Sequence, residues 1–169
     1  MEDLDPSMAR KLDLVDVLVE QANYEGALKV CNEAIDGNAN SFEFYSERAR
    51  IYHHLGRWSE ALRDLHVLIE LRPESPTAYL RRATLNLELG NYHLAVYDLT
   101  FVIESKDEYF LTAALFYRAV AHLKSGNKKE AILDCQELPS DFSFYIRTKD
   151  TLGQKLSRDE IHNMASSSP

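Results

Sequence analysis

Histidine and cysteine are the residues of this chain that could most readily do chemistry, if their spacing allows it. His53 and His54 form a suggestive pair for a metal ion, but neighbouring residues on a helix point about 100° apart and cannot easily share one ion. Cys31 and Cys135 are too few for a disulfide framework, and we interpret both as reduced core thiols. The pattern predicts no metal site.

Carboxylates offer the other candidate chemistry. Asp13, Asp16 and Glu20 share one helical face, which is typical of a solvated acidic surface. The sequence contains no glycine-rich phosphate loop and no nucleophile elbow. We therefore predict no catalytic residues, no cofactor and no enzymatic activity.

Composition limits the class of protein that can carry these residues. The 169 residues are 45% hydrophobic and 27% charged, with only 6 Gly and 5 Pro, which favours one all-α domain. The net charge of −8 opposes binding to nucleic acid. No apolar run is long enough to span a membrane, and the acidic N-terminus does not resemble a signal peptide. We expect a cytoplasmic protein without nucleic-acid or membrane partners.

An internal period organises the chain. Four similar segments share an alanine, at Ala27, Ala61, Ala95 and Ala131. The first three alanines are 34 residues apart and the last follows after 36. Five residues before three of them stands a glycine, at Gly56, Gly90 and Gly126. Apolar residues return at helical spacing on both sides of each glycine, so each unit is predicted to be two helices joined by a tight turn.

The second unit carries the most specific pattern. Its residues Tyr45, Ala49 and Tyr52, then Ala61 and Leu65, then Pro73, resemble the tetratricopeptide repeat. We place repeats at 8–41, 42–75, 76–109 and 112–145, after a lead-in at 1–7. The resemblance implies an all-α, right-handed α-α solenoid of four helix pairs, with a capping segment and frayed tail at 146–169.

The terminal repeats depart from this pattern. Repeat one has Ala22 in the glycine position and Lys11 in place of an aromatic residue, and repeat four has Lys128 before its alanine. Such departures are typical of repeats with a single neighbour.

A charge pattern accompanies the repeats. Arginine precedes the small residue of the first helix, and aspartate follows sixteen residues later, in the pairs Arg48 and Asp64, Arg82 and Asp98, and Arg118 and Asp134. Repeat one has Leu14 and Val30 at these positions, so the charges are present or absent together. We predict a salt bridge within each charged repeat and no role for these arginines in ligand binding.

The resemblance implies that the first helices of successive repeats line a concave groove that binds peptides or partner proteins. Arg50, Arg81 and the two histidines were expected to form a basic spot suited to an acidic and aromatic segment. The predicted partner-binding residues are Glu47, Arg50, His53, His54, Leu80, Arg81, Glu88, Phe116 and Tyr117.

Some members of the family grip the acidic C-terminus of heat-shock chaperones through a carboxylate clamp. The clamp positions here hold Leu12, Asp16, Glu47, Thr77 and Arg81, of which only Arg81 agrees. Acidic residues would repel a carboxylate, so a heat-shock C-terminal peptide is not the expected partner.

The last part of the chain breaks the period after Pro139. Phe142, Phe144 and Ile146 alternate with other residues, which fits either an extended segment or a helix that caps repeat four. Ser157 and Glu160 form a capping box that opens a short helix. The segment either caps the solenoid or binds a partner.

Three functions follow as hypotheses. The leading one is an adaptor or scaffold that binds a peptide or partner protein in the groove. The alternative is a dedicated chaperone or immunity-type protein for one secreted or toxic partner, which small size and acidity also fit. An enzyme or metal protein is the third, and no motif supports it.

Overall fold

The computed structural model describes residues 5–148 and 151–167, with the side chains of 151 and 152 left undescribed. The chain divides into two compact units, residues 1–74 and residues 75–169. We refer to them as unit 1 and unit 2 and describe each by itself.

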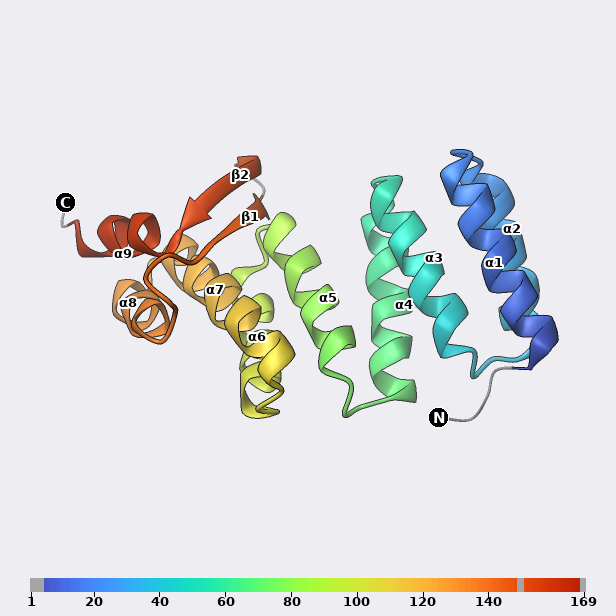
Figure 1. The fold of residues 1–169 in the computed structure, drawn as a ribbon, viewed down its shortest axis with the longest axis horizontal. Helices are drawn as coiled ribbons and strands as arrows, with labels where there is room; N and C mark the ends of the chain where they lie inside the picture. The colour runs from blue at the N-terminus through green and yellow to red at the C-terminus, as the bar shows by residue number, and fades with distance from the viewer. Residues whose placement is uncertain (1–4, 149–150, 168–169) are drawn as a thin grey trace. The chain divides into compact units, whose positions relative to one another are not determined.

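Unit 1 consists of two helix pairs. Helices α1 (Pro6–Glu20) and α2 (Tyr24–Gly37) form the first pair, and α3 (Phe42–His54) and α4 (Trp58–Leu71) form the second. The helices of each pair run antiparallel, and α3 packs against both α1 and α2 (Figure 1). The two pairs therefore stack within this unit as the repeat pattern predicts.

Unit 2 begins with two further pairs. Helices α5 (Pro76–Glu88) and α6 (Tyr92–Glu104) are followed by α7 (Glu108–Lys124) and α8 (Lys128–Gln136). Strands β1 (Ser143–Thr148) and β2 (Thr151–Ser157) then form an antiparallel hairpin, and α9 (Arg158–Ser166) ends the described chain. In the described residues no strand precedes residue 143, but β1 begins inside the segment 112–145 predicted for repeat four, whose second helix ends at Gln136.

The turn inside each helix pair contains one residue in the left-handed region. These residues are Ala22, Gly56, Gly90 and Gly126, with φ values of 56°, 70°, 78° and 82°. Glycine adopts this conformation at no steric cost, whereas alanine does not. The left-handed turn thus explains why glycine recurs at this position. Ala22 adopts the same left-handed conformation although it is not a glycine.

The repeat alanines lie where paired helices approach closely. Ala27, Ala61, Ala95 and Ala131 are all fully buried. Cys31 and Cys135, four residues after the first and last of them, are also buried and free. Burial raises the pKa of Cys31 to about 12 and that of Cys135 to about 11, so both thiols stay protonated at neutral pH.

The predicted arginine–aspartate pairs are confirmed in the three charged repeats. The Nε atoms of Arg48, Arg82 and Arg118 donate to one carboxylate oxygen of Asp64, Asp98 and Asp134 over 2.8, 2.8 and 3.0 Å. A second nitrogen donates to the other oxygen over 2.7, 2.7 and 2.6 Å. Hydrogen bonding to the aspartates raises the pKa of Arg48 and Arg82 further above its ordinary value. These arginines hold the helix pairs together.

The structure decides between the strand and the helix that the sequence allowed after Pro139. Residues 143–148 form a strand rather than a helix, and the register shifts between Ile146 and Arg147. The extra residue opposite this shift is Gly153, with φ of 71°, which fits a bulge with glycine in the left-handed region.

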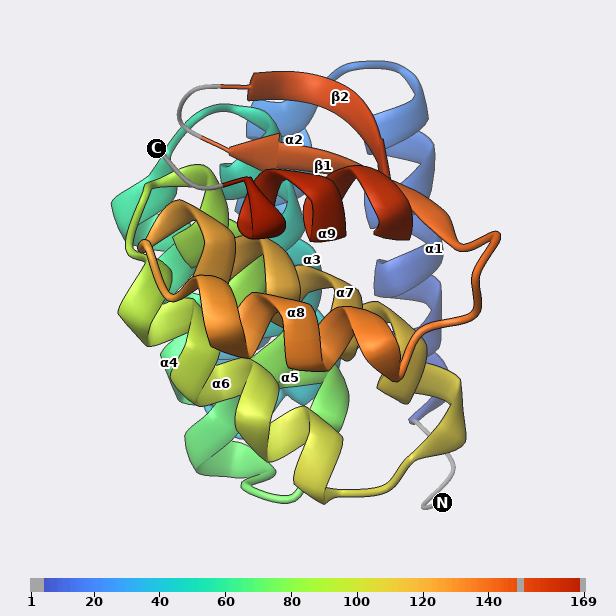
Figure 2. The same ribbon diagram turned by 90° about the vertical axis from the view of Figure 1, so that its left-hand side faces the viewer.

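Helix α9 covers the end of unit 2. It begins with the predicted capping box of Ser157 and Glu160 and packs on α8, with the hairpin on its other side (Figure 2). Its first residue, Arg158, donates Nε to the carbonyl of Cys135 over 2.7 Å. Ile161 and Ala165 are buried, so α9 supplies the cap that the exposed flank of the last repeat requires.

Candidate partner-binding surfaces

An open pocket lies between α1 and α3, the first helices of the two repeats in unit 1. It has a volume of about 260 Å³ and is lined by Leu12, Asp16, Phe42, Glu43, Ser46, Glu47 and Arg72. These residues come from α1, α3 and the residue that caps the C-terminus of α4; all are exposed or half-buried, and Leu12 also packs against the core of unit 1. The predicted groove residue Glu47 therefore lies on a hollowed surface between the first helices of two successive repeats.

Arg50 does not provide the basic spot expected from the sequence. Its guanidinium donates to the Glu47 carboxylate over 2.8 and 2.5 Å and approaches Asp16 at 3.5 Å. Two carboxylates thus offset its single positive charge, which corrects the expectation of a free basic group at this position. The other arginine of the surface, Arg72, pairs with Glu43 at 2.9 Å and lies over the Phe42 ring, 3.9 Å from its centre.

The balance of charge in unit 1 is negative. Residues 1–74 contain fifteen Asp and Glu against eight Lys and Arg, whereas residues 75–169 contain twelve against eleven. At the pocket itself three carboxylates face the two arginines just described. This surface favours positive charge in whatever binds there.

The two histidines lie apart from this pocket and pack against different rings. His53 contacts Trp58 with ring centres 5.2 Å apart, and His54 contacts Tyr24 at 4.6 Å. They therefore help to hold the turn end of α3 against its neighbours. Among the described residues, no group of three His, Cys, Asp or Glu side chains could hold a metal ion.

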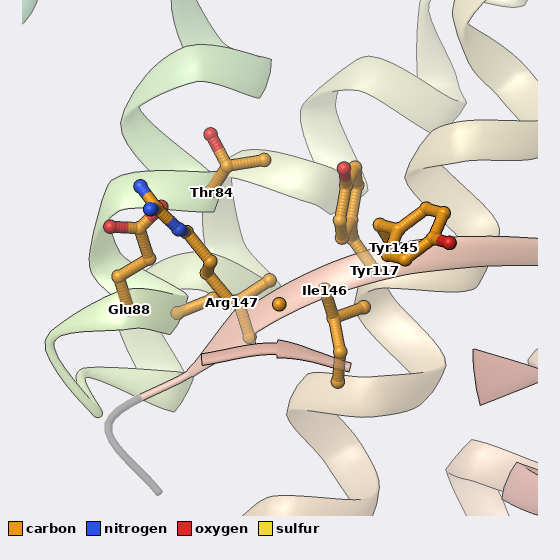
Figure 3. Close-up of a pocket in the computed structure, with 8 residues that line it drawn as sticks. Thr84, Glu88, Tyr117, Tyr145, Ile146 and Arg147 are labelled. Carbon is orange, nitrogen blue, oxygen red and sulfur yellow. The ribbon is translucent and has the colours of Figure 1, made fainter. Parts of the chain in front are cut away.

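Unit 2 has a second pocket, formed between its helices and the hairpin. It has a volume of about 330 Å³ and is lined by Thr84, Leu87, Glu88, Tyr117, Tyr145, Ile146, Arg147 and Gly153. Figure 3 shows Glu88 and Arg147 toward one end of the view and Tyr117 and Tyr145 toward the other. Two predicted groove residues, Glu88 and Tyr117, thus meet here.

The hairpin covers part of the face predicted to bind a partner. Phe142 and Phe144 stack on each other, and both rings contact Phe116 at centre distances of 5.5 and 6.2 Å. Phe116 is fully buried as a result, which corrects its prediction as an exposed groove residue. Phe144 also meets Tyr117 edge to face at 5.6 Å, and burial raises the pKa of Tyr117 to about 12.

The remaining predicted residues lie on α5. Leu80 is half-buried and packs against the core of unit 2, while Arg81 is exposed. Sequence reasoning missed Tyr145 and Arg147 as pocket residues. The sequence held no signal for them, because their place at the pocket depends on how β1 packs beside α5.

Comparison with known proteins was made against this geometry. The family model described as tetratricopeptide repeat matches residues 12–66 and 55–100, together more than half of the chain. The chain belongs to the tetratricopeptide-repeat family. The motif predicted from repeat two is therefore confirmed at the level of the family.

Several longer proteins contain a segment similar to this chain. It is 32% identical over 111 residues to human DnaJ homolog subfamily C member 3, covering 66% of this chain and 22% of that protein. It is 34% identical over 79 residues to the Hsp70-Hsp90 organizing protein of Triticum aestivum, covering 47% and 14%. The chain thus spans about a fifth or less of these relatives.

A solved structure supports the fold. MamA from Desulfovibrio magneticus RS-1 superposes with a TM-score of 0.70 at 18% identity, covering 79% of this chain and 75% of that one. At this identity the likeness concerns the fold alone. Within the described residues, none of the helices has the length and apolar character needed to cross a bilayer.

Proposed function

We propose that this tetratricopeptide-repeat chain is a protein-interaction module that binds a segment of a partner protein on the first helices of its repeats. The observation that carries the proposal is the open pocket between α1 and α3, whose lining side chains are all exposed or half-buried. Solvent-exposed carboxylates that line a hollow are in a position to contact a partner segment.

The chemistry of unit 1 indicates the kind of segment. The pocket combines carboxylates of Asp16, Glu43 and Glu47 with apolar contact from Leu12 and Phe42. Arg72 already shows how a guanidinium lies over the Phe42 ring while it pairs with a carboxylate. We therefore propose that the partner segment carries Lys or Arg and an adjacent apolar residue.

The same charges bear on the heat-shock clamp. Two relatives have names that include a DnaJ homologue and an Hsp70-Hsp90 organizing protein, so a chaperone partner is a reasonable alternative to test. The clamp positions Asp16 and Glu47 are both carboxylates that share Arg50. We propose that an acidic C-terminal peptide binds poorly, because these groups would repel its terminal carboxylate.

The test begins with affinity capture from the native host and identification of the captured protein. Its binding segment is then titrated by calorimetry against wild type, Asp16→Lys and Glu47→Lys. Each reversal should weaken binding by at least tenfold, and wild-type affinity should fall as salt concentration rises.

Glu70→Lys is the matched control, because it makes the same charge change at a side chain that is 65% exposed on α4 and outside the pocket. It should leave affinity unchanged, and melting curves should confirm that all variants fold. Unchanged affinity in both pocket variants, or tighter binding of an acidic segment, would contradict the proposal.

A further inference from the structure

The pocket under the hairpin has the construction of a site for a single side chain. Its floor is apolar, since Leu87 and Ile146 are each only 2% exposed. Its rim includes Tyr145, which is 66% exposed although it stands beside a hollow of about 330 Å³. A large aromatic side chain held at the edge of a pocket with a buried apolar floor is typical of a binding hot spot.

The polar groups of the pocket favour an uncharged occupant. Glu88 and Arg147 supply one negative and one positive side chain to the lining of the pocket (Figure 3). The rest of the polar lining consists of the hydroxyl groups of Thr84, Tyr117 and Tyr145. Unit 2 as a whole is also nearly balanced in charge. A charged occupant would lose its hydration here without a net opposite charge to compensate.

Size and shape point to an aromatic occupant. A cavity of about 150 Å³ is enough to hold benzene, so this pocket can hold an aromatic ring together with the start of its backbone. The side chains of Tyr117 and Tyr145 both line the pocket (Figure 3). Aromatic rings prefer to pack edge to face or offset against one another, as Phe144 already does on Tyr117.

We propose that the pocket formed by α5, α7 and the hairpin is a subsite for one uncharged aromatic side chain of a partner protein segment. The inference rests on the proposed protein-binding function and adds to it the chemistry of one recognised residue. The hairpin then has two roles: its inner residues Phe142 and Phe144 cover α7, and its outer residues Tyr145 and Arg147 complete the subsite.

The subsite can be tested on the full chain without the partner. Backbone amide signals are followed by two-dimensional NMR during titration with N-acetyl-phenylalaninamide, with N-acetyl-lysinamide and N-acetyl-leucinamide as comparisons. We expect saturable shifts at Thr84 and Gly153 with the phenylalanine amide at millimolar concentration. The leucine amide should bind at least threefold more weakly, and the lysine amide should produce no saturable shift.

Variants identify the residues responsible. Tyr145→Ser should weaken phenylalaninamide binding at least fivefold, and Thr84→Trp should abolish it by filling the pocket. Tyr109→Ser is the control, because Tyr109 is 84% exposed and does not line the pocket. Melting curves establish whether each variant folds. Tyr145→Ser changes a largely exposed residue and should fold, so it still tests the subsite if Thr84→Trp does not fold.

Absence of saturable shifts up to the solubility limit would overturn the subsite, as would equal binding of the lysine amide or unchanged binding by Tyr145→Ser. Because no partner is required, any of these results rejects the subsite alone. Failure of the calorimetric test on Asp16 and Glu47 instead rejects the proposed groove function.

Discussion

The pair Arg48 and Asp64 allows a direct test of how charge holds a helix pair together. The side chains are 17% and 6% exposed, and two hydrogen bonds of 2.8 and 2.7 Å join them. Arg48→Leu leaves the Asp64 carboxylate buried without its guanidinium, and breaking a buried ion pair in this way costs about 3–5 kcal/mol. Asp64→Val should cost less, about 2 kcal/mol, because the longer arginine can turn toward water.

The double variant Arg48→Leu, Asp64→Val gives the decisive comparison. Repeat one carries Leu14 and Val30 at these two positions, where Leu14 is 46% exposed and Val30 is half-buried. Replacing both charges should leave the free energy of unfolding within about 1 kcal/mol of wild type, well below the sum of the single losses.

Urea unfolding at pH 7 measures all four proteins. The single tryptophan, Trp58, begins α4 in the same unit and provides a local fluorescence signal. A loss below 1 kcal/mol for Arg48→Leu, or a double variant as unstable as that single variant, would refute the reasoning about the buried pair.

Three further outcomes concern stability. Ala22→Gly should raise the melting temperature, because left-handed alanine costs about 1–2 kcal/mol and the added chain entropy of glycine offsets about 0.4–1 kcal/mol; a lower melting temperature would show that the turn relaxes. Ala61→Leu should cost about 1–3 kcal/mol by overpacking a fully buried position, and unchanged melting would mean that the helix interface is misplaced. Burial lowers the pKa of His122 in the folded state below its ordinary value near 6.5. The contribution of the neutral side chain to stability is therefore complete above about pH 6.5 and should be lost as pH falls through the folded pKa. Acid titration of unfolding should therefore show less loss between pH 7 and 5 for His122→Phe, and equal curves would contradict this assignment.

Much of the fold could be predicted because the same pattern of residues occurs in four successive repeats. An alanine that returns after 34, 34 and 36 residues marks close helix contact, and in three repeats the glycine before it marks a left-handed turn. The Arg48 and Asp64 pair was predictable for a different reason: the two charges occur together in three repeats and are absent together in repeat one. Periodicity made each of these inferences testable within one sequence.

The binding surfaces were harder to predict because they depend on contacts between repeats. Arg50 seemed basic from its own position, yet Asp16, which offsets it, lies one repeat earlier, at a separation of 34 residues. Phe116 was placed on an exposed face because helical spacing alone cannot reveal a covering hairpin. The alternation after Pro139 occurs once in the chain, so no period was available to choose between strand and helix.

Site-specific photocrosslinking in the native host tests the central claim most directly. A benzophenone side chain is introduced at Asp16, on the pocket wall of α1, and separately at Glu70, on α4 outside the pocket. The proposed function predicts that position 16 crosslinks to a discrete partner protein, that position 70 does not, and that Glu47→Lys suppresses the crosslink. Crosslinking to the same partner at position 70 but not at position 16 would contradict the account.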